Sequence, residues 1–217
     1  MFRLTAVQEK ASSPPRSPRG ARLRPSLLLC VWLVCVASSF SALALYKSRA
    51  GDDGALASEH FPTGSSLSLA EDRPTLLMFV HPRCACSRAS LAELHKLLTS
   101  LNGAVAATVV LQTDGADRAT PTTDIAAKAQ ALPHARVLLD PGALEATRFG
   151  ARTSGHTLLY APDGHLLFSG GLTNSRGHEG PSLGQAHLLS ALRAAPTEKR
   201  AAPVYGCGLE EGNQRRE

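Results

Sequence analysis

The sequence predicts an α/β domain between residues 73 and 195, and three features predict it. Short apolar runs that suit buried strands alternate with segments in which leucine recurs at helical spacing. The sequence A-P-D-G at 161–164 lies between the last two apolar runs and is typical of a hairpin turn. Alternation of this kind implies a parallel sheet with right-handed crossovers, to which the hairpin adds an antiparallel edge.

The predicted strands and helices alternate as far as the hairpin, and a helix closes the domain. The strands are predicted at Thr75–Val80, Ala104–Leu111, Arg136–Leu139, Thr157–Tyr160 and His165–Ser169. The helices are predicted at 91–101 from a leucine stripe, at Thr122–Leu132 from a Thr-Thr cap, at Pro141–Phe149 from proline at the first position, and at Ser182–Ala194 from amphipathicity. A region of about 120 residues is large enough to bury a core without disulfides or metals.

The net charge of +5 comes from the first 25 residues. This leader is rich in serine, proline and arginine and has no apolar period, so we expect it to be disordered. It carries six basic residues and one acidic residue, whereas residues 26–217 carry equal numbers of each. The basic balance therefore gives no reason to expect a nucleic-acid partner. Five cysteines in 217 residues also exclude a disulfide-dense small scaffold.

Residues 26–46 are apolar and uncharged, and as a helix they are long enough to cross a bilayer core of about 30 Å. The basic leader favours a cytoplasmic N-terminus and an exported C-terminal domain. A cleaved signal peptide is the alternative, because A-L-A at 42–44 has the pattern of a cleavage site. Residues 47–72 are rich in glycine, serine and alanine, which predicts a linker. In both cases the thiols of the domain meet an oxidising compartment.

Two cysteines follow the first predicted strand, in the sequence H-P-R-C-A-C-S-R at 81–88. Reactive groups of parallel α/β sheets gather at the carboxyl ends of strands. Cys84 has Arg83 and Arg88 beside it at the start of a helix, so we expect its pKa to be lowered and its thiolate to be accessible. A capping-box pattern at Ser90 and Glu93 leaves open a later helix start, one turn after the cysteines.

The order of these elements resembles the thioredoxin-like fold, a three-layer sandwich. The segment FVHPRCACSRASLAEL also resembles a small group of bacterial membrane-tethered thioredoxin-like proteins labelled RedB, as do the segments 154–173, 175–180 and 203–209. The resemblance implies a redox role and a single-pass protein of the bacterial inner membrane, with its domain in the periplasm. Protein thiols or disulfides of that compartment would be its partners.

The sequence departs from ordinary thioredoxin relatives at three places. Cys84 matches the first cysteine of C-x-x-C, but Ser87 stands at the second, and the pair here is Cys84 and Cys86. Residues two apart on a helix point in nearly opposite directions, so a disulfide between them needs a non-helical turn. Gly155, followed by His156, stands where the cis-proline is expected. Cys207 lies in the tail 196–217, which we expect to be flexible and able to return to Cys84.

Three further polar residues accompany the cysteines. His81 and His178 lie in the matched segments, and each is either a site residue or a loop histidine. Glu179 either orients His178 or is a solvated acid. The alternative for Cys84 and Cys86 is two small packed residues, and for Cys207 an incidental thiol.

Two functions from different classes follow. The first is an exported thiol–disulfide oxidoreductase without a cofactor, in which Cys84 attacks a substrate disulfide and Cys86 or Cys207 resolves the mixed disulfide. The second is a copper or zinc metallochaperone or sensor that uses Cys84, Cys86 and His81, because thiolates and imidazole are suitable ligands for these metals. A copper(I) ion would take its third ligand from His81, His178 or Cys207.

Overall fold

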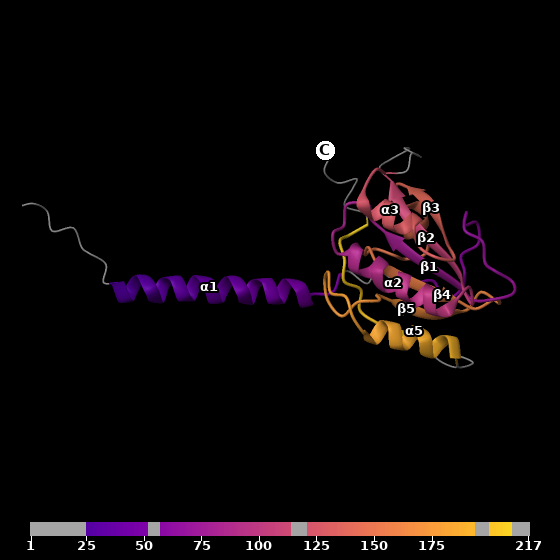
Figure 1. Cartoon of the computed structure of the whole chain (residues 1–217). Helices are drawn as coiled ribbons and strands as arrows, with labels where there is room; N and C mark the ends of the chain where they lie inside the picture. Colours follow the sequence, from indigo (N-terminus) through magenta and orange to yellow (C-terminus); the bar gives the residue numbers. More distant parts are fainter. Residues whose placement is uncertain (1–24, 52–56, 114–120, 194–199, 210–217) are drawn as a thin grey trace, which may run out of the picture. The chain divides into compact units, whose positions relative to one another are not determined.

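The computed structural model describes residues 25–51, 57–113, 121–193 and 200–209 (Figure 1). Its strands are β1 (Thr75–Val80), β2 (Ala106–Thr113), β3 (Ala135–Pro141), β4 (His156–Tyr160), β5 (Leu166–Gly170) and β6 (Arg200–Ala201). Its helices are α1 (Pro25–Ser48), α2 (Ser87–Leu101), α3 (Asp124–Gln130), α4 (Leu144–Arg148) and α5 (Leu183–Arg193).

The strands form one mixed sheet in the order β3-β2-β1-β4-β5-β6. Strands β1, β2 and β3 are parallel, and β4 pairs antiparallel with both β1 and β5. All six residues of β1 are buried, which explains why this strand reads as a continuous apolar run. The topology is that of the thioredoxin-like α/β fold, so the predicted fold class is confirmed.

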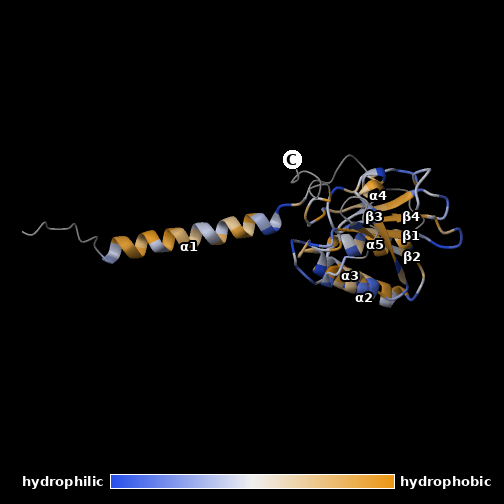
Figure 2. Ribbon diagram, turned by 90° about the horizontal axis from the view of Figure 1, so that it is seen from above, coloured by the Kyte–Doolittle hydropathy of each residue, from blue (hydrophilic) through white to orange (hydrophobic). Residues whose placement is uncertain are grey.

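Two apolar clusters cover the two faces of the sheet and give the domain that contains it three layers. One contains leucines of α2 together with apolar side chains of α3 and α5. The other contains Phe149 after α4 and apolar residues of the segment 57–69. Figure 2 shows the central strands as the most hydrophobic part of the domain. The cluster on the α2 side holds this helix, and with it the turn that precedes it, against the end of β1.

The region after β3 differs from the prediction. Pro141 does not begin a helix but ends β3, and α4 begins only at Leu144. Gly142 and Ala143 both have positive φ and turn the chain between the two elements. The carboxylate of Asp140 accepts the N–H groups of Glu145 and Ala146, at 2.9 Å each, and so caps the short helix. A side-chain cap of this kind makes a proline at the first position unnecessary.

The two segments that were expected to be a linker and a flexible tail are packed in their described parts. In residues 57–72, Ala57 and Leu67 are buried, and the N–H of Leu166 donates to the carbonyl of Glu59. In the tail, β6 pairs in parallel with β5, and Leu209 is buried. Apolar residues spaced through a polar composition anchor both segments, which composition alone does not reveal.

Helix α1 is a candidate membrane span. It has 24 residues, and none of its most hydrophobic window is buried against protein. Length and composition of this kind fit a transmembrane anchor, and near the N-terminus they fit a signal sequence equally well. The leader predicted to be disordered lies, up to residue 24, outside the described residues.

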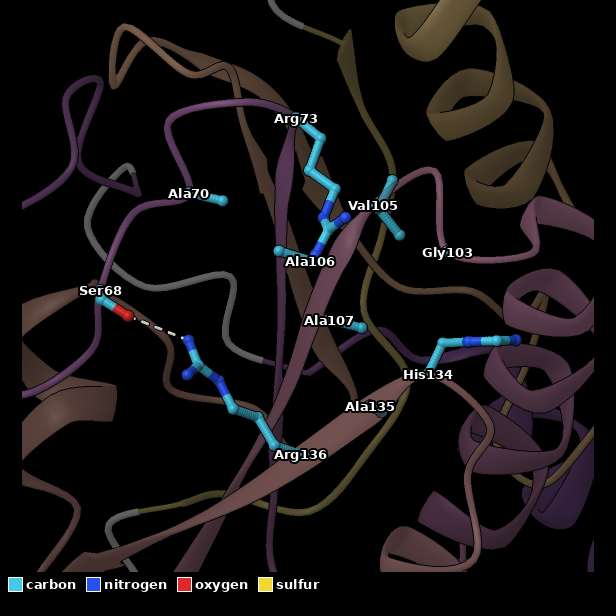
Figure 3. Close-up of a pocket in the computed structure, with 10 residues that line it drawn as sticks. All are labelled: Ser68, Ala70, Arg73, Gly103, Val105, Ala106, Ala107, His134, Ala135 and Arg136. Carbon is cyan, nitrogen blue, oxygen red and sulfur yellow. Dashed lines mark hydrogen bonds between the residues drawn. The ribbon is translucent and has the colours of Figure 1, made fainter.

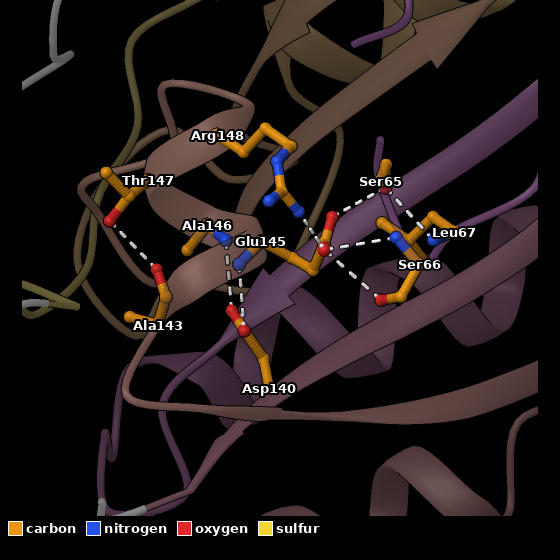
Figure 4. A network of polar contacts seen from close by, with 9 residues as sticks. All are labelled: Ser65, Ser66, Leu67, Asp140, Ala143, Glu145, Ala146, Thr147 and Arg148. Atoms are coloured by element: carbon orange, nitrogen blue, oxygen red, sulfur yellow. Dashed lines mark hydrogen bonds and ion pairs between the residues drawn. The ribbon is translucent and has the colours of Figure 1, made fainter. Parts of the chain in front are cut away.

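A network around Glu145 ties the segment 57–72 to the sheet (Figure 4). The carboxylate is 5% exposed, forms an ion pair with Arg148, and accepts hydrogen bonds from Ser65 Oγ at 2.5 Å and from the N–H of Ser66 at 3.1 Å. We expect Glu145→Ala to lower the free energy of unfolding by about 1–3 kcal/mol, because several partly buried hydrogen bonds to a charged group are lost together. Urea unfolding followed by circular dichroism tests this, with the exposed Glu71→Ala as control. Equal losses in the two variants would contradict it.

Candidate active site

The cysteine turn connects β1 to α2 at the carboxyl end of the central strand. The N–H of Cys84 donates to the carbonyl of His81 at 3.1 Å, and the N–H of Ser87 donates to the carbonyl of Cys84 at 3.0 Å. Helix α2 begins at Ser87, with Cys86 as its N-cap. The helix therefore starts directly after the cysteines, and the later start at Ser90 is wrong. Glu93, the other half of that pattern, accepts instead from Lys96, Gly180 and Gln185.

The tail brings Cys207 into contact with Cys84. The N–H of Cys207 donates to Cys84 Sγ at 3.3 Å. The thiol of Cys207 also donates to this sulfur, as do the side chain and the N–H of Ser87. These hydrogen bonds, with that of the Cys207 thiol the largest contribution, outweigh burial and lower the pKa of Cys84 to about 4. In the same contact the pKa of the Cys207 thiol is raised, because it donates to the neighbouring sulfur.

The cause and the setting of this thiolate differ from what we predicted. Cys84 is 0% exposed, so the expectation of an accessible sulfur is wrong. Arg88 turns away and pairs with Asp124 at 2.5 Å, and the backbone N–H of Arg83 donates to His81 Nδ1. Neither arginine is among the main causes of the lowered pKa of Cys84. The causes that lower it are hydrogen bonds from Cys207 in the tail and from Ser87.

The arginine at the cluster is Arg176, which our sequence analysis did not single out. Its guanidinium hydrogen-bonds Cys86 and donates to the carbonyl of Gly206. Burial raises the pKa of Cys86 and the nearby Cys84 raises it further, with Arg176 opposing both. The signal was present in the sequence, because Arg176 lies in the matched segment 175–180, but the histidine and glutamate of that segment drew attention instead.

The loop before β4 also holds the cysteine turn and the tail together. Ser154 Oγ lies 2.7 Å from Ser87 Oγ and accepts the N–H of His81 at 2.8 Å, while its own N–H donates to the carbonyl of Cys207. The structure contains no cis peptide bond in its described part, and Gly155 has a φ of +93°. A Cβ at Gly155 would lie 2.8 Å from Ser90 Oγ on α2. The glycine thus allows this loop to approach the cysteine helix closely.

The remaining predicted residues lie apart from the sulfurs or serve the backbone. His156 is buried on β4, with its Nε2 2.9 Å from Ser169 Oγ. His178 is exposed, and Glu179 forms an ion pair with Lys96 of α2 at 3.7 Å. The imidazole of His81 accepts the N–H of Arg83 and so closes the cysteine turn.

Within the described ranges, no three histidine, cysteine, aspartate or glutamate side chains are arranged to hold a metal ion. Cys84, Cys86 and His81 therefore do not form a ligand set in this arrangement. The prediction of copper or zinc binding gains no support from the geometry, and metal analysis of the purified protein is its test.

Two of the surface hollows in the described part of the chain lie at opposite ends of the sheet. The larger, about 480 Å³, is lined by residues at the starts of β1, β2 and β3, including Arg73, His134 and Arg136 (Figure 3). The other, about 320 Å³, lies beside the cysteine turn and is lined by Pro82, Ala85 and residues of α2 and α3. The second borders the turn that carries Cys84 and Cys86, but no cysteine lines it.

No model of a known protein family matches the sequence, and no curated protein matches it. A hypothetical protein from Sinorhizobium meliloti has a similar solved structure, with 20% identity and a TM-score of 0.53 over 76% of this chain and 97% of that chain. An uncharacterised conserved protein from Geobacillus kaustophilus has 16% identity and a TM-score of 0.50 over 75% of this chain and 92% of that chain. These likenesses show the fold. A putative thiol:disulfide interchange protein DsbE from Chlorobium tepidum has 16% identity and a lower TM-score of 0.42, over 66% of this chain and 98% of that chain.

Proposed function

We propose that this chain is a membrane-anchored thiol–disulfide oxidoreductase in which Cys84 is the nucleophile and Cys207 the resolving cysteine. One observation carries the proposal: the sulfur of Cys84 accepts hydrogen bonds from both the thiol and the N–H of Cys207. A thiolate is the attacking species in disulfide exchange, and a second thiol in contact with it is what a dithiol reaction requires.

The reaction has two exchanges. The Cys84 thiolate attacks one sulfur of a substrate disulfide, which forms a Cys84–substrate disulfide and releases the other substrate sulfur as a thiolate. Cys207 then loses its proton to that leaving thiolate and attacks Cys84 Sγ, which releases the second substrate thiol. The two cysteines are oxidised to a disulfide and the substrate is reduced by two electrons. An external dithiol reduces the pair again.

The neighbouring side chains have supporting roles in this proposal. Ser87 donates to the Cys84 thiolate from the position that holds a cysteine in C-x-x-C, so it stabilises the anion and cannot resolve the intermediate. Arg176 holds the tail through Gly206 and touches Cys86. Because the pKa of Cys86 is raised, this thiol is a poorer nucleophile than Cys84 at neutral pH.

The location of the site is part of the same proposal. Helix α1 would anchor the chain in a bacterial inner membrane, with the basic leader in the cytoplasm and the domain in the periplasm. Protein disulfides of that compartment would be the substrates. The four matched segments support membership of the RedB-like group, and they include both Cys84 and Cys207.

Reduction of insulin disulfides by the full chain in detergent, with dithiothreitol as the reductant, tests the activity. We expect Cys84→Ser to reduce the rate to that of dithiothreitol alone, because no other thiol of the site has a lowered pKa. The matched control is Cys35→Ser, which removes a thiol of α1 and should leave the rate unchanged. Wild-type activity in Cys84→Ser would refute the assignment.

A further inference from the structure

The tail meets the loop before β4 as an extended strand. Thr153 and Gly208 form an antiparallel bridge. The N–H of Ser154 donates to the carbonyl of Cys207, and the N–H of Leu209 donates to the carbonyl of Arg152, both at 2.8 Å. These are main-chain contacts, so the loop 152–154 is a strand-binding edge that reads an extended backbone rather than particular side chains.

This strand is what covers the Cys84 sulfur. Cys84 lies at a strand end on the surface of the sheet, yet it is 0% exposed, and the residue that donates to its sulfur is in the tail. Because Cys207 contacts the Cys84 sulfur directly, a sulfur of another protein that approaches along the loop 152–154 needs the place that Cys207 occupies. An incoming substrate strand must therefore displace the tail and take its position along residues 152–154.

The docking site, by which we mean the place that the tail occupies along the loop 152–154, has no room for a side chain at Gly206, the residue before the cysteine. A Cβ built on Gly206 would lie 1.9 Å from the carbonyl oxygen of Ser154 and 3.3 Å from Thr153 Cγ2. The first contact is with backbone, which cannot rotate away as a flexible side chain can. Apart from glycine, any residue at this place forces the strand away from the loop and its cysteine away from Cys84.

We propose that the chain's own tail occupies the docking site along the loop 152–154 between turnovers, and that this site selects an extended substrate segment with glycine directly before the reacting cysteine. The inference rests on the proposed function, because it concerns the substrate of the same sulfur. It also sets the order of the steps in the reaction. A substrate strand and the tail segment around Cys207 occupy the same position along the loop, so the substrate backbone must leave the loop before Cys207 resolves the Cys84–substrate disulfide.

The test compares two peptides that differ only before the cysteine. They are PVYGCGL, which copies the tail, and PVYACGL, each carrying nitrothiobenzoate on its cysteine through a disulfide. Attack by Cys84 joins the peptide to the protein and releases the coloured thiolate, whose rate is followed. The protein is the full chain with Gly206→Ala and Cys207→Ser, which removes the tail from the docking site and prevents resolution. Mass spectrometry confirms attachment at Cys84, and the rates of both peptides with free glutathione correct for intrinsic reactivity.

We expect the glycine peptide to react at least about tenfold faster than the alanine peptide, since overpacking against a rigid backbone is costly. Corrected rates within about twofold of each other would overturn the inference, because the docking site would then not distinguish glycine from alanine before the cysteine. The single variant Cys207→Ser, which keeps the native tail, should show the same ratio at lower rates. It serves as the second protein if Gly206→Ala disturbs folding.

A small disulfide separates the two levels of the proposal. Dithiodipyridine needs no docking site, so it should modify Cys84 in the double variant even if both peptides fail. Modification by this reagent without a preference between peptides would overturn the docking site and leave the proposed function standing. Failure of Cys84 to react with dithiodipyridine would overturn both.

Discussion

Replacing Cys207 with alanine is expected to stop turnover and raise the pKa of Cys84, whereas serine at the same position is expected to stop turnover alone. Alanine removes the thiol that donates to the Cys84 sulfur, and that hydrogen bond is the largest cause of the lowered pKa. Serine keeps an O–H donor in the same place but cannot form a disulfide. The pair of variants therefore separates the electrostatic role of Cys207 from its redox role.

The expected size follows from the strength of hydrogen bonds to charged groups. Loss of one such bond costs about 1.5–3 kcal/mol, which corresponds to a rise in the Cys84 pKa of roughly 1–2. Donors from Ser87 and from the N–H of residue 207 remain, so the pKa should stay below that of a free thiol. Ultraviolet absorbance of the thiolate, titrated against pH in the presence and absence of Cys84→Ser, measures it.

Turnover is measured in the same variants with a protein disulfide and dithiothreitol. Dithiothreitol would cleave a mixed disulfide, so the intermediate is sought in a single reaction of the reduced variants after this reductant has been removed. Both variants should then accumulate the Cys84–substrate disulfide, which mass spectrometry detects, because the resolving sulfur is absent. Rapid turnover in both variants would exclude Cys207 as the resolving residue and would favour Cys86. An unchanged Cys84 titration in the alanine variant would show that the thiol of residue 207 does not stabilise the anion.

The fold could be predicted from the sequence because its determinants are local. Six consecutive buried residues in β1 and the leucine stripe of α2 show their periods directly. The position of Cys84 before a helix follows from the same local order. The predicted helix start at Pro141 was wrong, because the chain turns after Pro141. The carboxylate of Asp140 caps the helix instead, by accepting the N–H of Glu145 five residues later.

The surroundings of Cys84 could not be predicted in the same way. The Cys207 donors to its sulfur come from a tail 123 residues away in sequence. We expected that tail to be flexible, and its sequence does not show the strand that it forms. At Gly206 a Cβ would lie 1.9 Å from the carbonyl oxygen of Ser154, so the absence of a side chain allows the two backbones to meet.

The lowered pKa of Cys84 also predicts how folding stability changes with pH. The folded state holds this sulfur as a thiolate above about pH 4, whereas an unfolded thiol keeps its proton up to a pKa near 9.0. Between these values the unfolded state binds one more proton, so the free energy of unfolding rises with pH. The raised pKa values of Cys86 and Cys207 act in the opposite direction, but only above the pKa of an unfolded thiol.

Unfolding of the reduced protein is therefore expected to show a positive slope between about pH 5.5 and 8, approaching ~1.4 kcal/mol per pH unit, that Cys84→Ser lacks. Circular dichroism is the suitable probe, because the single tryptophan, Trp32, lies in α1 and not in the domain. The buried Asp140, whose pKa burial raises, contributes equally to both proteins and cancels in the comparison. Parallel pH profiles for the wild type and Cys84→Ser would mean that the sulfur is protonated in the folded state, and the tail would then cover a thiol and not an anion.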